Sequence, residues 1–197
     1  GAPAPKPLST LTKVVVDSPF NLESTASVLQ LGIVKGEFAK ENLSVSIVNL
    51  PAADAIPQAS NGAIDVVIAG IDPSLFNAGA NDLAFKAVMG LFYSTNSGDY
   101  NIAQQGWWCR RDAFSTPSKP KLKEIEHLRL ATSTGKSAVA LFQLPAMLKA
   151  KGVTVNLKNT TVDAVPTANT VLALQNKAVD CGFVNDPLWQ PLSANPA

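Results

Sequence analysis

Short polar segments follow four apolar runs of the chain, and they contain residue types that bind small molecules. The segments are residues 17–21 (DSPFN), 70–74 (GIDPS), 133–137 (STGKS) and 185–186 (ND). Their carboxylates and amides accept hydrogen bonds, and their hydroxyls both accept and donate them. Because open α/β sheets bind ligands beyond the carboxyl ends of their strands, we expect these segments to form a ligand site.

Fifteen residues are the candidates for ligand binding. They are Asp17, Ser18, Phe20, Asn21, Gly70, Asp72, Ser74, Trp108, Ser133, Thr134, Gly135, Lys136, Ser137, Asn185 and Asp186. Plainer roles compete with this one, since Asp72 before Pro73 is typical of a helix cap and residues 133–137 of a polar turn. Trp107 and Trp108 alternate across a predicted strand, so one should face the core and the other the opposite surface.

The sequence favours binding over catalysis. The STGKS segment lacks the first glycine of a phosphate-binding P-loop, because Leu130 occupies that position. His127 lies among charged residues, as is typical of a solvated helix end. No residues have the arrangement of a nucleophile with its base, and none have the spacing of a metal site. We therefore expect no catalytic residue, no cofactor and no metal.

The class of ligand depends on two opposing features. Helix starts after Gly70 and Ser133, together with Lys136, favour an anion such as a sulfonate. Three carboxylates, Asp17, Asp72 and Asp186, oppose an anion, because like charges at about 4 Å repel by about 4 kcal/mol at an effective dielectric constant of 20. We therefore expect a small organic amine or aminopyrimidine ahead of a sulfonate. Aromatic rings at Phe20, Trp108 or Trp189 could stack on such a solute.

Composition excludes several classes of protein. The chain has 197 residues, of which 46% are hydrophobic and 16% charged, and its formal net charge is +1. This balance argues against a disordered chain and against nucleic-acid binding by bulk charge. Cys109 and Cys181 allow one disulfide, and two buried free thiols are the alternative.

Apolar runs alternate with longer amphipathic stretches along the chain. The expected strands cover residues 14–16, 45–50, 66–69, 85–92, 104–110, 129–132, 153–157 and 181–184. The expected helices cover residues 22–38, 52–61, a segment from 72 onward, 138–151 and 165–178. Such alternation predicts an α/β fold with mostly parallel sheets and helices on both faces.

Residues 29–73 (LQLGIVKGEFAKENLSVSIVNLPAADAIPQASNGAIDVVIAGIDP) and 165–189 (VPTANTVLALQNKAVDCGFVNDPLW) resemble the solute-binding proteins of nitrate/sulfonate/taurine ABC importers. That family also contains thiamine-pyrimidine binders and synthases. Asn176-Lys177 departs from its pattern, which has glycine there. The resemblance implies a two-lobe periplasmic-binding-protein fold of type II, with a ligand cleft between the lobes. Since the family continues beyond the second crossing, we interpret the first lobe as incomplete.

The resemblance also implies an organisation of the chain. We expect an N-terminal tether at residues 1–8, a first lobe at 9–93, a second lobe at 94–185 and the start of a return crossing at 186–197. The connection at residues 93–101 marks the lobe boundary. Because the two crossings of one hinge lie side by side, Cys109 and Cys181 should lie in neighbouring strands.

By this resemblance, the protein would be an extracytoplasmic monomer that binds a small solute and delivers it to a membrane permease. The proline-rich start, GAPAPKP, is typical of the end left by a removed signal peptide, so we expect a periplasmic or extracellular location, with tethering to the membrane as an option. A synthase-like enzyme and a sensor domain are the alternatives. No nucleic-acid partner is expected.

Overall fold

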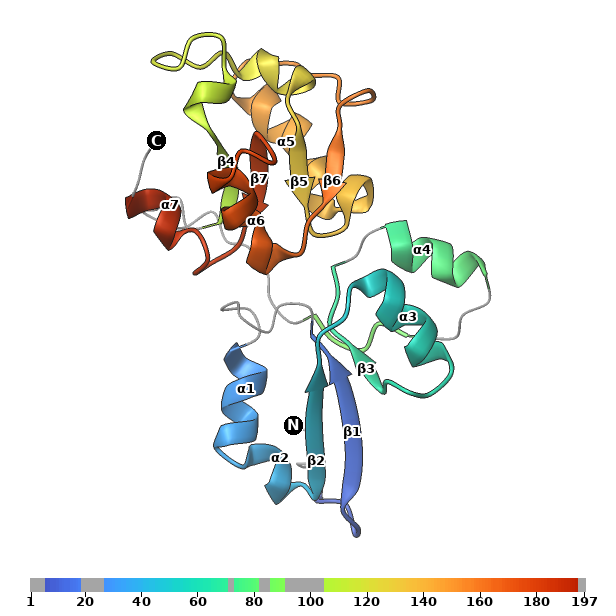
Figure 1. The fold of residues 1–197 in the computed structure, drawn as a ribbon. Helices are drawn as coiled ribbons and strands as arrows, with labels where there is room; N and C mark the ends of the chain where they lie inside the picture. Colours follow the sequence, from blue (N-terminus) through green and yellow to red (C-terminus); the bar gives the residue numbers. More distant parts are fainter. Residues whose placement is uncertain (1–5, 19–26, 71–72, 82–85, 91–104, 195–197) are drawn as a thin grey trace. The chain divides into compact units, whose positions relative to one another are not determined.

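The structure is a computed structural model, and it describes residues 6–18, 27–70, 73–81, 86–90 and 105–194. The chain divides into two compact units (Figure 1). Residues 1–70 and 74–94 belong to the first unit, and residues 71–73 and 95–197 to the second. The predicted boundary at residues 93–101 lies outside the described residues, so the limits of the lobes stay predictions. Each unit contains one sheet with helices packed against it.

The first unit is built on a three-stranded parallel sheet. Its strands are β1 (Thr12–Asp17), β2 (Leu43–Val48) and β3 (Val66–Val67), in the order β2-β1-β3. Val14 pairs with Val45, and Val16 pairs with Val66, so β1 lies in the centre. The third strand is shorter than the predicted 66–69. Val66 is 40% exposed, which also contradicts the expectation that both faces of this strand are covered.

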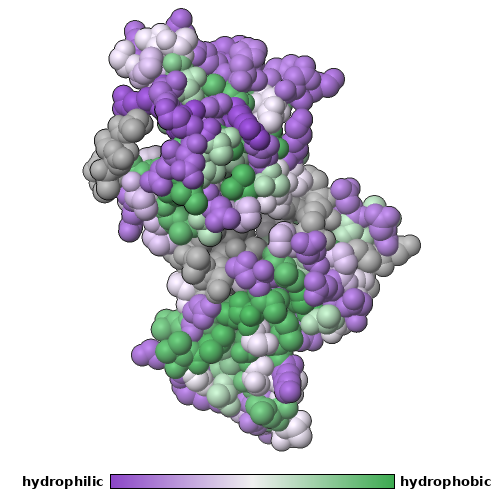
Figure 2. Space-filling view, in the orientation of Figure 1, coloured by the Kyte–Doolittle hydropathy of each residue, from purple (hydrophilic) through white to green (hydrophobic). Residues whose placement is uncertain are grey.

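Among the described residues, the helices that accompany this sheet are α1 (Ser27–Val34), α2 (Glu37–Lys40), α3 (Ala52–Ser60) and α4 (Pro73–Ala80). The sequence predicts a helix over 22–38 that Gly32 or Gly36 weakens or ends. Its interruption is confirmed at Gly36, and residues 22–26 lie outside the described residues. Gly36 adopts a φ of 69°, which glycine tolerates best, and it separates α1 from α2. The outer side of α1 exposes Val28, Leu31 and Val34, and Figure 2 shows apolar residues gathered over this part of the unit.

The second unit contains a four-stranded mixed sheet. Its strands are β4 (Gly106–Cys109), β5 (Leu130–Thr132), β6 (Val162–Ala164) and β7 (Cys181–Val184), in the order β4-β7-β5-β6. β4 runs antiparallel to β7, and the other pairs are parallel. The parallel part confirms the predicted fold class.

Two strand predictions are wrong. Residues 86–90 of the predicted strand 85–92 are exposed and form no strand, and the remainder lies outside the described residues. Residues 153–157 also form no strand, because side chains of a neighbouring helical turn take their backbone groups. Lys123 Nζ donates to the Thr154 carbonyl at 2.7 Å, and Glu126 accepts from the Asn156 N–H.

Helices pack on both faces of the second sheet (Figure 1). They are α5 (Val139–Ala150), α6 (Thr167–Gln175) and α7 (Gln190–Ala194), with shorter 3-10 turns η2 (Arg111–Ala113), η3 (Leu122–His127) and η4 (Gly135–Ser137). Trp107 packs with Leu144 of α5, whereas Trp108 packs with Leu174 of α6, as the alternation of strand side chains predicts. Gly182 allows the α6 contact, because a Cβ there would lie 2.4 Å from Thr170 Cγ2.

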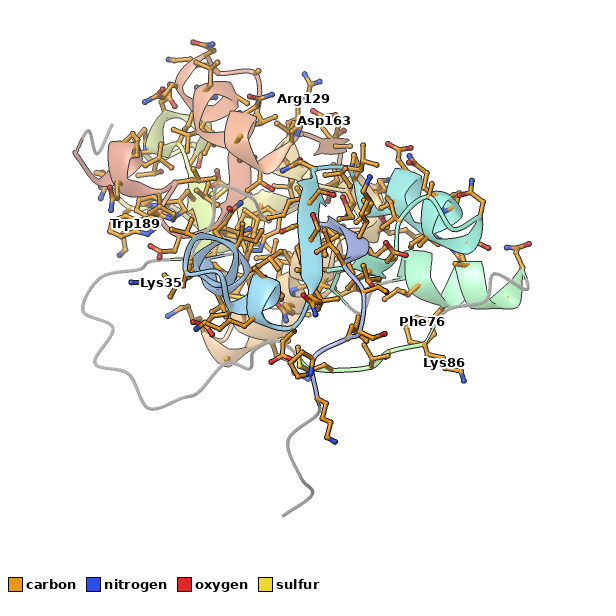
Figure 3. The ribbon with its side chains drawn as sticks, turned by 90° about the horizontal axis from the view of Figure 1, so that it is seen from below. Lys35, Phe76, Lys86, Arg129, Asp163 and Trp189 are labelled. Atoms are coloured by element: carbon orange, nitrogen blue, oxygen red, sulfur yellow. A yellow bond between two sulfur atoms is a disulfide. The ribbon has the colours of Figure 1, made fainter. Side chains whose placement is uncertain are left out.

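An ion pair and a disulfide connect neighbouring strands of this sheet. Arg129 Nε binds Asp163 at 2.5 Å, and Figure 3 shows the two residues side by side. Cys109 and Cys181 are register partners on β4 and β7, with Cα atoms 4.0 Å apart, and they form a disulfide. The predicted proximity of the cysteines is confirmed, and the free-thiol alternative is wrong.

The disulfide predicts a large effect of reduction on stability. It joins residues 72 positions apart, so its loss frees a long loop in the unfolded chain. We expect Cys109→Ser with Cys181→Ser to lower the free energy of unfolding by about 2–5 kcal/mol, measured by urea denaturation. The same urea midpoint for the oxidised wild type and the double variant would contradict this prediction.

Candidate functional site

Asp17 and Ser18 lie at the carboxyl end of the central strand of the first unit. The Asp17 carbonyl accepts from the Ile68 N–H at 2.9 Å, and the Ser18 N–H donates to the Val48 carbonyl at 2.9 Å. These bonds fix the end of β1 between its two neighbours. Both residues are fully buried, at 0% exposure. The sequence therefore predicted their place at the end of the strand correctly.

The side chains of these two residues retain unused hydrogen-bonding atoms. Asp17 Oδ1 accepts from the Leu50 N–H at 2.8 Å. Asp17 Oδ2 and Ser18 Oγ have no hydrogen-bond partner in the described part of the chain. Burial raises the pKa of the Asp17 carboxyl, and the Leu50 N–H opposes this effect only in part. Since buried polar groups are normally paired, these two oxygens are the strongest indication of a ligand site in this unit.

The structure describes only two of the other ligand-binding candidates in the first unit, Gly70 and Ser74. Gly70 is exposed and follows β3, and Ser74 is the second residue of α4. Pro73 begins that helix, as predicted. Phe20, Asn21 and Asp72 lie outside the described residues, so their predicted roles stay predictions.

In the second unit, the segment after β5 forms a tight turn. Thr132 Oγ1 donates to the Gly135 carbonyl at 2.7 Å, and Ser137 Oγ donates to the Thr134 carbonyl at 2.9 Å. Ser133 and Lys136 are exposed on this turn. The plainer alternative, a polar turn, accounts for these bonds. No hydroxyl caps α5, because Ala138 occupies the N-cap position.

Asn185 and Asp186 follow β7, the neighbour of β5 in the sheet. Asp186 Oδ1 accepts from Trp189 Nε1 at 2.8 Å. The Trp189 ring stacks on Trp108 with centroids 6.3 Å apart and planes 7° apart. Trp108 is therefore a half-buried packing residue, and Asp186 holds the indole of Trp189 in place. The expectation that Asp186 is an unpaired carboxylate is wrong.

The structure therefore brings the candidates together in two groups. Asp17 and Ser18 form one group in the first unit, and the segments after β5 and β7 form another at one edge of the second sheet. Sequence reasoning missed the Leu50 N–H and the Thr132 hydroxyl, which bind parts of these groups. No sequence signal marks the Leu50 contact, because it depends on the register between β1 and β2.

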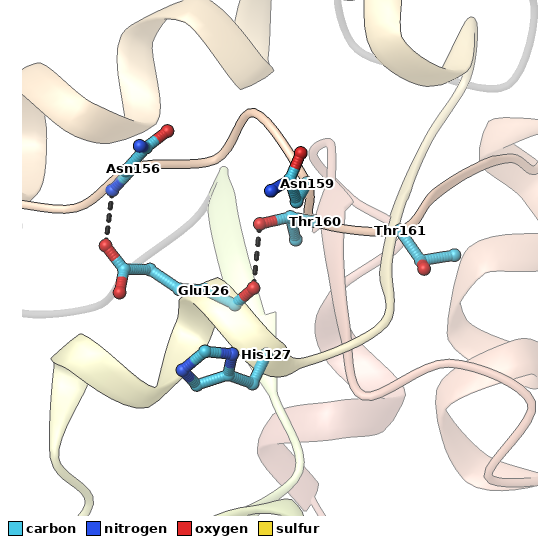
Figure 4. Close-up of a pocket in the computed structure, with 6 residues that line it drawn as sticks. All are labelled: Glu126, His127, Asn156, Asn159, Thr160 and Thr161. Carbon is cyan, nitrogen blue, oxygen red and sulfur yellow. Dashed lines mark hydrogen bonds between the residues drawn. The ribbon is translucent and has the colours of Figure 1, made fainter.

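A separate depression lies at the opposite edge of the second sheet, before β5 and β6 (Figure 4). Its volume is about 420 Å3, and it is lined by Glu126, His127, Asn156, Asn159, Thr160 and Thr161. The ammonium of Lys123 and then the Asn156 N–H lower the pKa of Glu126. His127 is exposed at the end of η3, as expected of a solvated position.

The described ranges contain neither a candidate metal site nor a membrane-spanning helix. They contain no group of three or more His, Cys, Asp and Glu side chains that could hold a metal ion. Nor do they contain a helix of the length and apolarity needed to cross a membrane.

No protein-family model and no curated protein matches the sequence. Solved structures do match. A protein from Bordetella bronchiseptica RB50 aligns with a TM-score of 0.66 and 18% identity, over 93% of this chain and 54% of its own. The alkanesulfonate-binding protein SsuA from Xanthomonas axonopodis pv. citri, bound to MOPS, aligns with a TM-score of 0.60 and 16% identity, over 95% of this chain and 59% of its own.

The chain has the fold of the type II periplasmic substrate-binding proteins. The substrate-binding protein of an amino acid ABC transporter also aligns, with a TM-score of 0.50 and 16% identity, over 94% of this chain and 75% of its own. The resemblance drawn from the sequence is thus confirmed for the fold. The chain spans somewhat more than half the length of the first two of these proteins.

The buried carboxyl of Asp17 predicts a stability that depends on pH. A raised pKa means that the folded state binds the proton more readily than the unfolded state, so ionised Asp17 destabilises the fold above its folded-state pKa. We expect Asp17→Asn to raise the free energy of unfolding near neutral pH by about 1–3 kcal/mol. This gain should shrink as the pH falls below the folded-state pKa and should vanish below the ordinary pKa that the unfolded chain has, measured by denaturation at several pH values.

Asp65→Asn is the matched control. Asp65 is exposed, and its carboxylate accepts from the Val15 N–H at 2.8 Å on the same strand. Asp65→Asn should leave the free energy of unfolding unchanged or lower it slightly. An equal gain for both variants, or a loss for Asp17→Asn near neutral pH, would contradict the role assigned to burial.

Proposed function

We propose that the protein is the solute-binding component of an ABC importer, and that it captures a small organic solute carrying N–H donors. The observation that carries this proposal is a pair of buried oxygens, Asp17 Oδ2 and Ser18 Oγ, at the carboxyl end of a central parallel strand. Neither has a hydrogen-bond partner among the described residues. The fold supports the class of function. Delivery to a permease and capture in a cleft between the lobes are parts of the proposal.

The chemistry of Asp17 favours an amine over an anion. An ammonium or amidine N–H would form a charge-assisted hydrogen bond with the free carboxylate oxygen and would offset the cost of burying it. A sulfonate at the same place would face a buried negative charge. Asp186 binds Trp189, and Asp72 lies outside the described residues, so Asp17 is the carboxylate on which the preference for an amine rests. A sulfonate stays the alternative ligand.

The disulfide supports a binding role in an oxidising compartment. Cys109 and Cys181 are bonded to each other, so neither supplies the free thiol that a cysteine-dependent synthase would use. Disulfides persist mainly in secreted and periplasmic proteins. We therefore propose a periplasmic or extracellular monomer, with membrane tethering left as part of the proposal.

Calorimetric titration tests the ligand class. We expect an amine or aminopyrimidine, selected by a thermal-shift screen that includes taurine and alkanesulfonates, to bind the wild type. Asp17→Asn should weaken that binding at least tenfold, because it removes the carboxylate charge that would pair with the N–H donors of the ligand. Asp186→Asn should have a smaller effect, since its carboxylate binds Trp189. Tighter binding of a sulfonate than of any amine, unchanged by both substitutions, would overturn the proposal.

The affinity for an amine should also depend on pH. Ionised Asp17 is the form that binds a cation, and its pKa in the free protein is raised by burial. Affinity should therefore be highest above this pKa and should fall as the pH drops through it, by up to tenfold per pH unit. The decline should begin at a higher pH than the ordinary aspartate pKa would give. A flat profile from neutral pH down to the range of ordinary aspartates would count against Asp17 as the anchor.

A further inference from the structure

Positive charge is concentrated at one edge of the second unit. Residues 105–194 contain eleven Lys and Arg but only six Asp and Glu. Lys136 follows the carboxyl end of β5, and the other ten basic residues lie near the amino ends of the parallel strands or on the segments leading to them. These ten are Arg110, Arg111, Lys119, Lys121, Lys123, Arg129, Lys149, Lys151, Lys158 and Lys177.

The acidic residues at this edge of the second unit already form ion pairs or hydrogen bonds with neighbouring residues. Arg110 binds Asp180 at 2.8 Å and Asp112 at 3.2 Å, and Lys177 binds Asp112 at 2.6 Å. Glu126 binds Lys123 at 2.7 Å. Glu124 accepts from the Ser115 N–H and hydroxyl at 2.8 and 2.6 Å.

Five exposed lysines make no ion pair within the described part of the chain. We call them the lysine face: Lys119, Lys121, Lys149, Lys151 and Lys158. They come from three segments whose apolar sides share one core cluster. Leu122 and Ile125 of η3, Leu148 of α5, and Val155 and Leu157 of the following segment all pack there.

Hydrogen bonds tie two of these segments together on the outside. Lys123 of η3 reaches the Thr154 carbonyl at 2.7 Å, and Thr160 Oγ1 donates to the Glu126 carbonyl at 2.9 Å. Figure 4 shows the polar depression between η3 and this neighbouring segment, with Asn156, Asn159 and Thr161 along it. These bonds place the segment that carries Lys119 and Lys121 beside the segment that carries Lys158, with the polar depression between them.

Helix electrostatics explain only part of this arrangement. Lys149 and Lys151 lie at the C-terminal end of α5, where a cation is favourable in any protein. Lys119, Lys121 and Lys158 lie on no such helix end. A surplus of cations that local structure does not use indicates an anionic partner.

The composition of the face distinguishes between kinds of partner. Protein–protein hot spots are rich in Trp, Tyr and Arg. At this edge, the exposed basic residues without an ion pair in the described part of the chain are the five lysines and one arginine, Arg111, beside amides and hydroxyls. Lysine is a compact charge on a flexible stem, which suits many phosphate groups without fixed geometry. We propose that the lysine face binds the surface of a bilayer that contains anionic phospholipids. Several lysines on one surface are attracted together by the negative surface potential of an anionic leaflet.

Vesicle sedimentation with the full chain tests this proposal without any solute. Vesicles of phosphatidylcholine alone are compared with vesicles that also contain about 30% phosphatidylglycerol. We expect binding to the anionic vesicles only, and a steep fall between about 0.05 M and 0.5 M salt. The triple variant Lys121→Glu, Lys149→Glu, Lys158→Glu should bind at least tenfold more weakly.

The matched control is the triple variant Lys13→Glu, Lys35→Glu, Lys86→Glu in the first unit. These lysines are also exposed, and Figure 3 shows Lys35 and Lys86 extending away from the ribbon. The control changes the net charge equally and should keep most of the binding, and thermal melts should show that both variants are folded. Equal losses in the two triple variants would overturn the proposal, because net charge alone would then explain binding. So would a lack of binding to the anionic vesicles.

Discussion

The backbone pairing of β1 with both of its neighbours is the constraint on which the site in the first unit depends. The register with β2 and β3 makes Asp17 the last paired residue of β1. The Ile68 N–H then donates to the Asp17 carbonyl at the end of the strand. The Asp17 side chain consequently lies where three strands end, out of contact with water. One of its oxygens receives the Leu50 N–H, and the other has no such donor in the described part of the chain. An ionisable group in that position costs stability, and a ligand that donates to it would recover that cost.

The second unit uses its polar groups differently. At the carboxyl edge, Thr132 and Ser137 bind carbonyls of their own turn, and Asp186 binds Trp189. At the amino edge, ion pairs and the disulfide join η2, β4 and β7. The candidates with the clearest unused bonding capacity are therefore in the first unit, whereas the clearest unused charge is on the lysine face of the second. Solute capture and membrane contact would then depend on different parts of the chain.

Sequence patterns predicted the buried strands well and the exposed ones poorly. Residues 14–16 and 181–184 are continuous apolar runs, and each became a strand with buried residues. The segment 153–157 alternates apolar and polar residues, as a half-buried strand does, but Lys123 and Glu126 bind its backbone groups and it joins no sheet. The strand at 162–164 was missed because Asp163 interrupts its apolar pattern, and that carboxylate is paired with Arg129. The place of Asp17 followed from the ends of the strands, but the pairing of Asp186 with Trp189 required the three-dimensional structure.

Carbon-13 NMR of the Asp17 carboxyl, titrated with pH in the free protein and with a bound amine, tests the central claim most directly. The raised pKa of the free protein should fall when the amine binds, because a nearby cation favours the ionised form. A pKa of Asp17 that does not change on binding, or that rises, would contradict the account.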